Sequence, residues 1–375
     1  MESLVEFETL GERGSVAVAR LVREKSLNSL LLETVDQLYA KITSWLLDDS
    51  VKCIILDSGS PRAFCAGADI VALYRSIAGV EKDKSLYADQ FFLSEYRLDY
   101  ALQMKNKPIV GWGAGIVMGG GLGLLSGCSH RIGSRSTRIA MPEITIGLFP
   151  DAGGTKFLSC MPDGLGWFLG LTGSQLPAGD ALALDLLDVV VEESNKHEVF
   201  KAISELDWSK DALPNAALIS RTLKDYEIKK GLPTHLMHYR MEIAALIHSC
   251  LLSDNFFTEF EKKLPLIDAD EWMSLGLQNY QKGSPTTARI FEQQMNRADN
   301  LDWAEVFRME LSIAYHCARD TDFPEGVRAL LVDRDLNPTW RFSNPVQVPD
   351  DFIKRFFESP WTEDSHPLRE LGQKR

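Results

Sequence analysis

Two short, uninterrupted apolar runs, each followed by a glycine-bearing segment, constrain the fold of this chain more than any other feature. The runs are residues 53–56 (CIIL) and 108–112 (PIVGW). Continuous apolar runs of this length predict strands that are buried on both faces. The segments that follow are 63–70 (AFCAGADI) and 115–123 (GIVMGGGLG). Together with helical patterns between the strands, this order predicts an α/β architecture.

Strand-like and helix-like patterns alternate through the rest of the first half. Further strands are expected at 15–22, 130–132 and 138–141, with a turn at 133–137. Helices are expected at 31–47 and 85–104, and the turn at 119–126 leads into another. Residues 180–330 are mainly helical, with weak breaks near 210–214 and 231–233. We therefore expect an α/β core over 1–200, a helical region over 201–345 and a polar C-terminal tail over 346–375.

Composition and charge exclude several classes of partner. The net charge of −13 and the scattered Lys and Arg residues argue against a nucleic-acid-binding protein, which needs a concentrated basic face. No apolar run approaches the ~20 residues that a membrane span requires. The N-terminal MESLVEFETL lacks the pattern of a signal or transit peptide. We expect a cytoplasmic protein that does not associate with membranes.

The cysteines and histidines give no pattern of a metal site. The six cysteines form no CxxC pair, and we expect them to be reduced, buried thiols. Cys65 lies beside a glycine turn, where a nucleophile is one interpretation and buried packing the other. His130 is expected to be a hydrogen-bonded core residue. The pairs at 235/238 and 316/317 lack a third ligand, so no metal is expected.

The two glycine-bearing turns have two interpretations. A turn that opens into a helix aims free N–H groups forward, and two such turns on neighbouring strands could form an oxyanion hole. The alternative is tight packing of strand against helix. No G-x-G-x-x-G, P-loop or G-x-S-x-G pattern fits either segment, so a nucleotide fold and a serine nucleophile are not indicated.

Two acids, Glu143 and Asp151, lie in the apolar stretch AMPEITIGLFPDAGG at 140–154. Carboxylates in apolar surroundings have raised pKa values and are suited to acid–base work near neutral pH. They could therefore form a catalytic pair. The alternatives are a partly exposed acid at a strand end for Glu143, and an N-cap of a helix at 155–160 for Asp151.

The motifs, taken together, resemble the crotonase (enoyl-CoA hydratase/isomerase) superfamily. The matching pieces are KSLNSL at 25–30, AFCAGAD at 63–69, GIVMGGGLG at 115–123 and MPEITIGLFPDAGG at 141–154. Within the superfamily, the chain is most similar to the 3-hydroxyisobutyryl-CoA hydrolase branch. FFLSEY at 91–96, GIVMGGG, the Asp of GLFPD and a distal SPT…MEL…DF.EGVRALLVDRD.NP.W pattern at 284–340 indicate this branch.

The resemblance implies a spiral of β-turn-α repeats, followed by a helical region that helps to close the site. It implies hydrolysis of a short-chain 3-hydroxyacyl-CoA, with 3-hydroxyisobutyryl-CoA of valine breakdown as the leading candidate. Coenzyme A is then part of the substrate, no metal or other cofactor is needed, and a homo-oligomer is compatible with the family.

The same resemblance implies roles for individual residues. The N–H groups of Ala68 and Gly120 would form the oxyanion hole, and Glu143 would be the main catalytic carboxylate with Asp151 as its partner. Glu95 would line the substrate pocket. Ala66, in the segment that runs along the CoA, would contact its adenine end.

The chain departs from family patterns at a few positions. Gly123 stands where hydratases carry a second glutamate, which argues against water addition by two glutamates. The hydrolase branch has AGGD and FFREEY, where this chain has Ala68 and the pair Leu93 and Ser94. These changes leave the acyl-group preference open. Two alternatives remain: a hydratase or isomerase that uses Glu143 as a single base, and a non-catalytic acyl-CoA-binding protein.

Overall fold

The chain divides into two compact units that are interleaved along the sequence. The computed structural model describes residues 4–78 and 86–373. Unit 1 comprises the described residues up to Ala68, then Arg97–Ile139 and Leu176–His235. Unit 2 comprises Asp69–Tyr96, Ala140–Gln175 and the chain from Leu236 onward. The predicted boundaries at residues 200 and 345 divide the chain into consecutive regions, and they stay a prediction.

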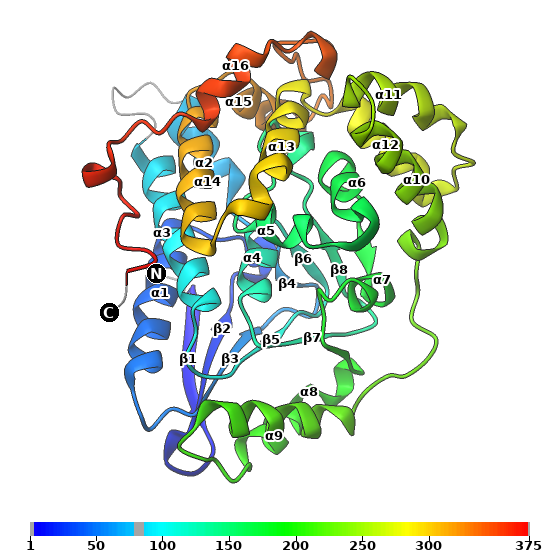
Figure 1. Cartoon of the computed structure of the whole chain (residues 1–375). Helices are drawn as coiled ribbons and strands as arrows, with labels where there is room; N and C mark the ends of the chain where they lie inside the picture. The colour runs from blue at the N-terminus through cyan, green and yellow to red at the C-terminus, as the bar shows by residue number, and fades with distance from the viewer. Residues whose placement is uncertain (1–3, 79–85, 374–375) are drawn as a thin grey trace. The chain divides into compact units, whose positions relative to one another are not determined.

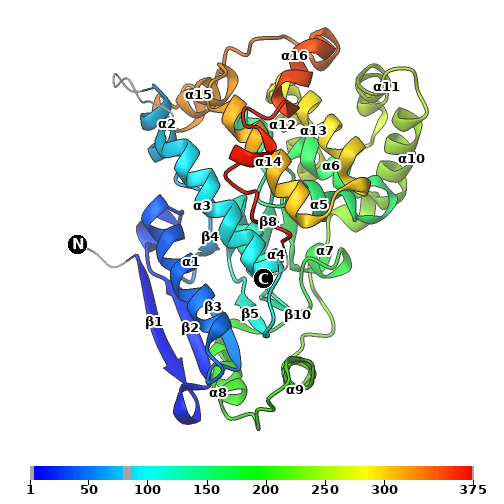
Figure 2. The same cartoon turned by 60° about the vertical axis from the view of Figure 1, so that its left-hand side comes forward.

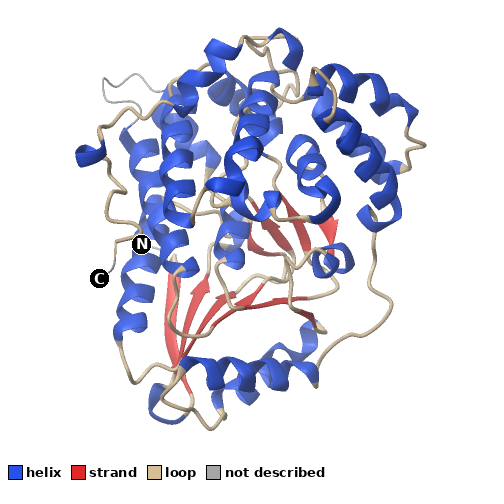
Figure 3. Cartoon of the chain, in the orientation of Figure 1, coloured by secondary structure: helices blue, strands red, loops and turns tan. Residues whose placement is uncertain are grey.

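Unit 1 is built on a six-stranded sheet with the order β1-β2-β3-β5-β7-β10 (Figures 1 and 3). Its strands are β1 (Val5–Leu10), β2 (Val16–Leu21), β3 (Cys53–Ser58), β5 (Ile109–Trp112), β7 (His130–Gly133) and β10 (Val189–Val190). β1 runs antiparallel to β2, and the other neighbours are parallel. All residues of β3 and β5 are buried, as the continuous apolar runs predicted.

A second, four-stranded sheet has the order β4-β6-β8-β9, and all of its residues except Ala140 belong to unit 1. It contains β4 (Ala63–Cys65), β6 (Ile116–Met118), β8 (Arg138–Ala140) and β9 (Leu176–Pro177). Strands β3, β5 and β7 of the first sheet are each followed along the chain by β4, β6 and β8 of the second. The chain therefore winds between two sheets in repeats, and the predicted spiral α/β fold is confirmed.

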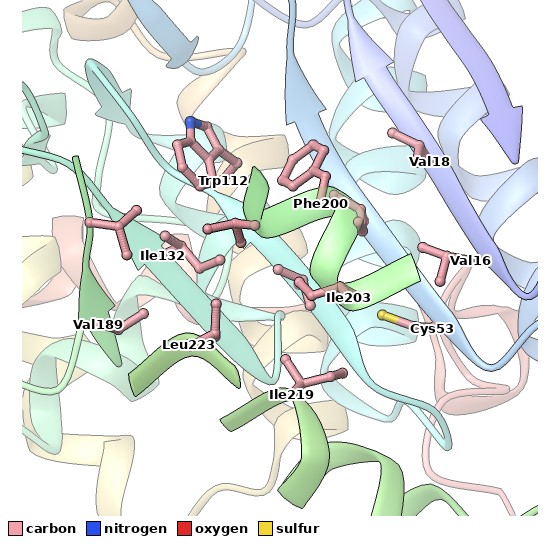
Figure 4. Close-up of a cluster of buried hydrophobic side chains, with 14 of the residues drawn as sticks. Val16, Val18, Cys53, Trp112, Ile132, Val189, Phe200, Ile203, Ile219 and Leu223 are labelled. Atoms are coloured by element: carbon pink, nitrogen blue, oxygen red, sulfur yellow. The ribbon is translucent and has the colours of Figure 1, made fainter. Parts of the chain in front are cut away.

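Helices cover the first sheet of unit 1. Its helices are α1 (Leu32–Leu47), α4 (Gly120–Ser126), α7 (Ala178–Ala183), α8 (Lys196–Ser204) and α9 (Ala212–Lys224). Figure 2 shows α1 alongside β1–β3. The rings of Phe7 and Trp45 pack edge to face between β1 and α1, with centroids 5.7 Å apart. α8 and α9 pack Phe200, Ile203, Ile219 and Leu223 into the cluster of Figure 4.

Apolar side chains of this cluster pack α8 against the sheet. The ring of Phe200 meets Trp112 of β5 edge to face, with ring centroids 5.6 Å apart and an interplanar angle of 90°. Val16 and Cys53 from neighbouring strands complete the same layer. Burying large apolar side chains stabilises the layer by about 1.5–3 kcal/mol for each side chain.

Unit 2 is helical. Its helices are α2 (Ile70–Ala78), α5 (Gly154–Ser159), α6 (Leu165–Thr172), α10 (Arg240–Leu251), α11 (Phe256–Lys263), α12 (Glu271–Lys282), α13 (Pro285–Arg297), α14 (Trp303–Cys317), α15 (Asp322–Val327) and α16 (Asp350–Lys354). α3 (Leu86–Gln103) belongs to unit 2 up to Tyr96 and to unit 1 from Arg97. All residues of α6 are buried. Its sequence LGWFLGLT is correspondingly apolar, with one threonine as the exception.

The structure differs from the sequence-based expectations in three places. The predicted break near 210–214 is present but lies a few residues earlier, at 205–211 between α8 and α9. Pro214 itself falls in the first turn of α9, where proline is tolerated. The short strand β10 lies in the region expected to be helical. The tail is less polar than predicted, since Ile353, Phe356 and Leu368 are buried. Residue 85, at the start of the expected helix 85–104, lies outside the described residues.

The cysteines and the helices can also be compared with the sequence-based expectations. All six cysteines are free, and five of them are buried as expected. Cys160 is exposed, so the expectation of a buried thiol was wrong there; it is the C-cap residue of the short helix α5. No helix in the described part of the chain is both long and apolar enough to span a membrane.

Candidate active site

The two glycine-bearing turns of unit 1 lie side by side, because β4 and β6 are parallel neighbours. Parallel strands end at the same edge of a sheet, so the turns that follow them meet. A Cβ atom placed on Gly67 would lie 2.8 Å from the carbonyl oxygen of Met118 and 3.3 Å from the nitrogen of Gly120. Gly67 also has a φ of +88°, a conformation that favours glycine.

Replacing Gly67 by alanine is expected to lower the free energy of unfolding by about 2–4 kcal/mol, from positive φ plus steric overlap. The matched control is Gly231→Ala. Gly231 has a φ of +74° and no atom within 4 Å of the added Cβ, so about 1–2 kcal/mol is expected. Urea unfolding measures both, and equal losses would show that the close approach to Met118 is unimportant.

The backbone N–H groups expected to bind an oxyanion belong to Ala68 and Gly120. Among the turns and loops that the structure describes, neither Ala68 nor Gly120 donates its N–H to a carbonyl. Gly120 is the first residue of α4, whose N-cap Gly119 has a φ of 52°. The alternative interpretation also holds in part, since Gly121 packs against the carbonyl of Cys65. Gly121 thus serves strand–helix packing, and the role of the two N–H groups stays a prediction.

Asn28 fixes the segment that leads to Ala68. It lies in KSLNSL with a φ of +56°, and its buried side-chain amide donates to Ser58 Oγ at 2.7 Å and to the carbonyls of Ala63 and Phe64, each at 3.1 Å. The N–H of Leu30 in turn donates to the Gly67 carbonyl at 2.8 Å. Sequence reasoning used this motif only for the resemblance and missed its bonds.

Cys65 and His130, which the sequence analysis expected to be core residues rather than catalytic ones, have structural roles. Cys65 is fully buried, and its Sγ accepts from the N–H of Gly67 at 3.4 Å. His130 is buried, with ring nitrogens 2.9 Å from Ser129 Oγ and 3.0 Å from both Ser220 Oγ and the Ala216 carbonyl. Both expectations of a core role are confirmed. The described residues contain no group of three or more metal-ligating side chains.

Glu143 is a buried acid of unit 2. It follows Pro142 and opens a short 3-10 helix, η3 (Glu143–Ile146), where its side chain is 5% exposed. The alternative of a partly exposed acid was wrong. Burial, and secondly the charge of Asp151, raise the pKa of Glu143 well above its usual value. Among the residues that the structure describes, Glu143 Oε2 has no hydrogen-bond partner, which leaves it available to a substrate or water.

Asp151 is the second buried acid of unit 2. The hydroxyl of Tyr96 donates to its Oδ2 at 2.8 Å. Burial raises the pKa of Asp151 to about 6, while the Tyr96 hydrogen bond opposes the rise. The N-cap alternative was wrong: the residue before α5 is Gly153, and no side chain caps this helix. Asp151 is therefore held for another purpose than helix capping.

The other residues expected at the site lie in separate units. Glu95 is buried on α3 in unit 2, next to Tyr96, and its charge contributes to the raised pKa of the Tyr96 hydroxyl after burial, Asp151 and Glu310. Ala66 is half-buried in unit 1, where its N–H donates to the Leu27 carbonyl at 3.0 Å. Unit 1 thus contains Ala66, Ala68 and Gly120, and unit 2 contains Glu95, Glu143 and Asp151.

Sequence reasoning missed two residues beside Asp151, Tyr96 and Glu310. Tyr96 directly follows Glu95 in FFLSEY, so the motif itself contained it. Glu310 lies on the same face of α14 as the buried Phe307 and Ala314. An acid at an apolar position of a helix was the available signal, because a buried carboxyl needs partners.

Comparisons with known proteins identify the family of this chain. The family model for enoyl-CoA hydratase/isomerase matches residues 16–357. The chain belongs to this family. It is 33% identical over 355 residues to the mitochondrial 3-hydroxyisobutyryl-CoA hydrolase of Homo sapiens, covering 95% of this chain and 89% of that protein. The Gallus gallus relative of the same name is 32% identical over 349 residues, covering 93% and 88%.

Solved structures agree with the family at the level of fold. A carnitinyl-CoA dehydratase from Mycobacterium thermoresistibile superposes with a TM-score of 0.84 at 27% identity. The match covers 99% of this chain and 100% of that one. The resemblance to the crotonase superfamily is therefore confirmed over the helical region as well as the α/β core.

Proposed function

We propose that this protein hydrolyses a short-chain 3-hydroxyacyl-CoA thioester, with 3-hydroxyisobutyryl-CoA as the preferred substrate. The observation that carries the proposal is the pair of buried carboxyls, Glu143 and Asp151, whose pKa values are both raised. Gly123, a buried residue of α4, has no side chain to serve as the second glutamate of a hydratase. The names of the relatives at 32–33% identity support the choice of substrate.

Thioester hydrolysis develops negative charge on the carbonyl oxygen. We propose that the N–H groups of Ala68 and Gly120 stabilise that charge. A positioned donor of this kind contributes about 3 kcal/mol, or 10²–10³ in rate. The two donors come from backbone, so the change from AGGD to Ala68 leaves the chemistry of the donor intact. The reaction itself needs no metal or redox cofactor.

Glu143 is proposed as the group that delivers the oxygen nucleophile. Either it removes a proton from water, which attacks the carbonyl, or its own carboxylate attacks and forms a mixed anhydride that water opens. Both routes break the C–S bond and release CoA, whose thiolate takes up a proton. Asp151 is proposed to orient Glu143 or the acyl hydroxyl, or to supply that proton.

The pair of acids predicts the pH dependence of hydrolysis. Two coupled carboxyls titrate as a pair, and one of them must lose its proton before it acts as a base. If the Asp151 carboxylate orients Glu143 or the acyl hydroxyl, kcat/KM is expected to rise as the pH increases through about 6, the pKa of Asp151. If Asp151 instead supplies the proton to the thiolate, kcat/KM is expected to fall over the same range. Removing the hydroxyl in Tyr96→Phe removes a hydrogen bond that lowers this pKa, so the limb is expected to move to higher pH.

The pH profiles of kcat/KM for the wild type and Tyr96→Phe test this expectation. Tyr280→Phe is the matched control, because Tyr280 is also buried and its hydroxyl donates to a carboxylate, Glu261, at 3.4 Å. The control should keep the wild-type limb. A limb that stays in place or moves to lower pH in Tyr96→Phe would contradict the assignment of Asp151 to the titrating pair.

A panel of short 3-hydroxyacyl-CoA and enoyl-CoA esters, scored for free CoA with a thiol reagent, tests the function. We expect CoA release, fastest with 3-hydroxyisobutyryl-CoA, which would place the protein in valine breakdown. Hydration of an enoyl-CoA without CoA release would instead support a hydratase or isomerase. Binding without turnover would support a non-catalytic acyl-CoA-binding protein. The cytoplasmic location stays a prediction; the names of the two animal relatives include "mitochondrial".

A further inference from the structure

The backbone around Asp151 adopts a conformation that has to be held in place. Ala152 has a φ of +52° and Gly153 a φ of +86°. A non-glycine residue at positive φ persists where its surroundings over-determine it. The carboxyl of Asp151 therefore depends on whatever fixes the backbone on either side of it.

Glu310 fixes the side that follows Asp151. Its carboxyl is fully buried, and its Oε2 accepts from the N–H of Gly153 at 2.9 Å. Its Oε1 accepts from the N–H of Thr155 at 3.1 Å and from Thr155 Oγ1 at 2.7 Å. One carboxyl on α14 thereby satisfies three donors of a segment more than 150 residues earlier in the chain.

Gln294 fixes the side that precedes Asp151. From α13, its Nε2 donates to the carbonyl of Pro150 at 3.0 Å and to Thr155 Oγ1 at 2.7 Å. Thr155 Oγ1 thus accepts from Gln294 and donates to Glu310, and it joins the two sides. These bonds, all within unit 2, enclose residues 150–155 from two helices.

Aromatic side chains on α14 complete the support. A Cβ atom on Gly153 would lie 3.0 Å from Trp303 Cζ3 and 3.6 Å from Phe307 Cζ. The ring of Phe307 lies 5.9 Å from that of Tyr96, which donates to Asp151. The same helix therefore supports both the backbone of the segment and the phenol that binds its carboxyl.

We propose that Glu310, Gln294 and Thr155 are positioning residues that hold the Asp151 carboxyl in its reactive place. We name these three side chains the Asp151 clamp. The proposal rests on the proposed function, since it gives the clamp a catalytic purpose. A displacement of about 1 Å at a reacting group can lower the rate about 10²-fold, so a clamp of this kind acts on kcat.

The chemistry of the clamp selects its variants. Glutamine at 310 has one acceptor oxygen, so its NH2 group must face either the Gly153 N–H or the Thr155 donors. Glu310→Gln is therefore expected to lower kcat about 10²-fold. Thr155→Val keeps the shape but removes the bridging hydroxyl, and a loss of about tenfold is expected. Thr155→Ser keeps the hydroxyl and should retain kcat within about threefold.

Two measurements on the full chain test the clamp. The first is kcat and KM for CoA release from 3-hydroxyisobutyryl-CoA. The second, independent of activity, is hydrogen exchange of the amides at Gly153 and Thr155. The matched control is Asp180→Asn, a fully buried acid of unit 1 whose carboxylate accepts from the N–H of His235 at 2.7 Å.

A lower kcat with KM near the wild-type value in Glu310→Gln and Thr155→Val, together with faster exchange, supports the clamp. Thr155→Ser and Asp180→Asn should retain kcat. Faster exchange with unchanged kcat overturns the clamp, because the hydrogen bonds would then be structural only. A fall in kcat in Asp180→Asn equal to that in Glu310→Gln also overturns the clamp. A wild type that binds the ester but releases no CoA overturns the proposed function, whatever the exchange shows.

Discussion

Glu143→Gln is expected to lower kcat for CoA release by about 10³-fold or more, the range for loss of a general base or nucleophile. Glutamine has nearly the same shape and remains buried, but it can neither accept a proton from water nor attack a thioester. The measurement is release of free CoA from 3-hydroxyisobutyryl-CoA under saturating substrate. The dissociation constant for the ester should stay within a few-fold of the wild-type value.

Glu292→Gln provides the matched control for this substitution. Glu292 is a partly buried glutamate of unit 2 whose pKa is likewise raised by burial, and its carboxylate pairs with Arg289 at 3.2 Å. Its variant should hydrolyse the ester at the wild-type rate. Turnover retained in Glu143→Gln would remove Glu143 from the reaction and with it the proposed mechanism.

Asp151→Asn is expected to lower kcat about 10²-fold, the lower part of the range for loss of an acid–base group. The asparagine carbonyl can still accept from the Tyr96 hydroxyl, so the segment should keep its structure, but the side chain no longer titrates. The limb of kcat/KM near pH 6 should therefore change together with the rate. Steady-state kinetics between pH 5 and 8 measure both quantities.

Normal kinetics in Asp151→Asn would contradict the assignment of this residue, and no helix-capping role remains to explain its burial. A loss confined to KM would instead assign Asp151 to substrate binding. Asp180→Asn again serves as the control for replacing a buried aspartate that accepts a backbone N–H.

Local sequence patterns predicted the strands that carry the donor turns. The run at 53–56 is apolar at every position, and β3 is buried at every position, since no alternation was needed for a strand covered on both faces. The glycine turns were also predictable from sequence, because the close approach of two backbone segments leaves no room for a Cβ atom at Gly67. Which N–H group has a role came from the resemblance to a family and stays a prediction.

Long-range partners were beyond the reach of such patterns. Asp151 is followed by residues that suit a helix start. Local sequence was therefore compatible both with an N-cap role and with a catalytic role for Asp151. Its burial and its bond to Tyr96, 55 residues away in sequence, exclude the cap. Glu310 was overlooked because an acid within a helical pattern normally faces solvent.

The sequence by itself determined the α/β class, the family, the buried strands and the two acids proposed to be catalytic, because these depend on residue type, periodicity and motif. Only the tertiary structure decided that Glu143 and Asp151 are buried with raised pKa values, and that Glu310 and Gln294 hold the backbone on both sides of Asp151. The physical reason is that burial and hydrogen bonding arise between segments far apart in the chain, whereas propensity and periodicity act between near neighbours.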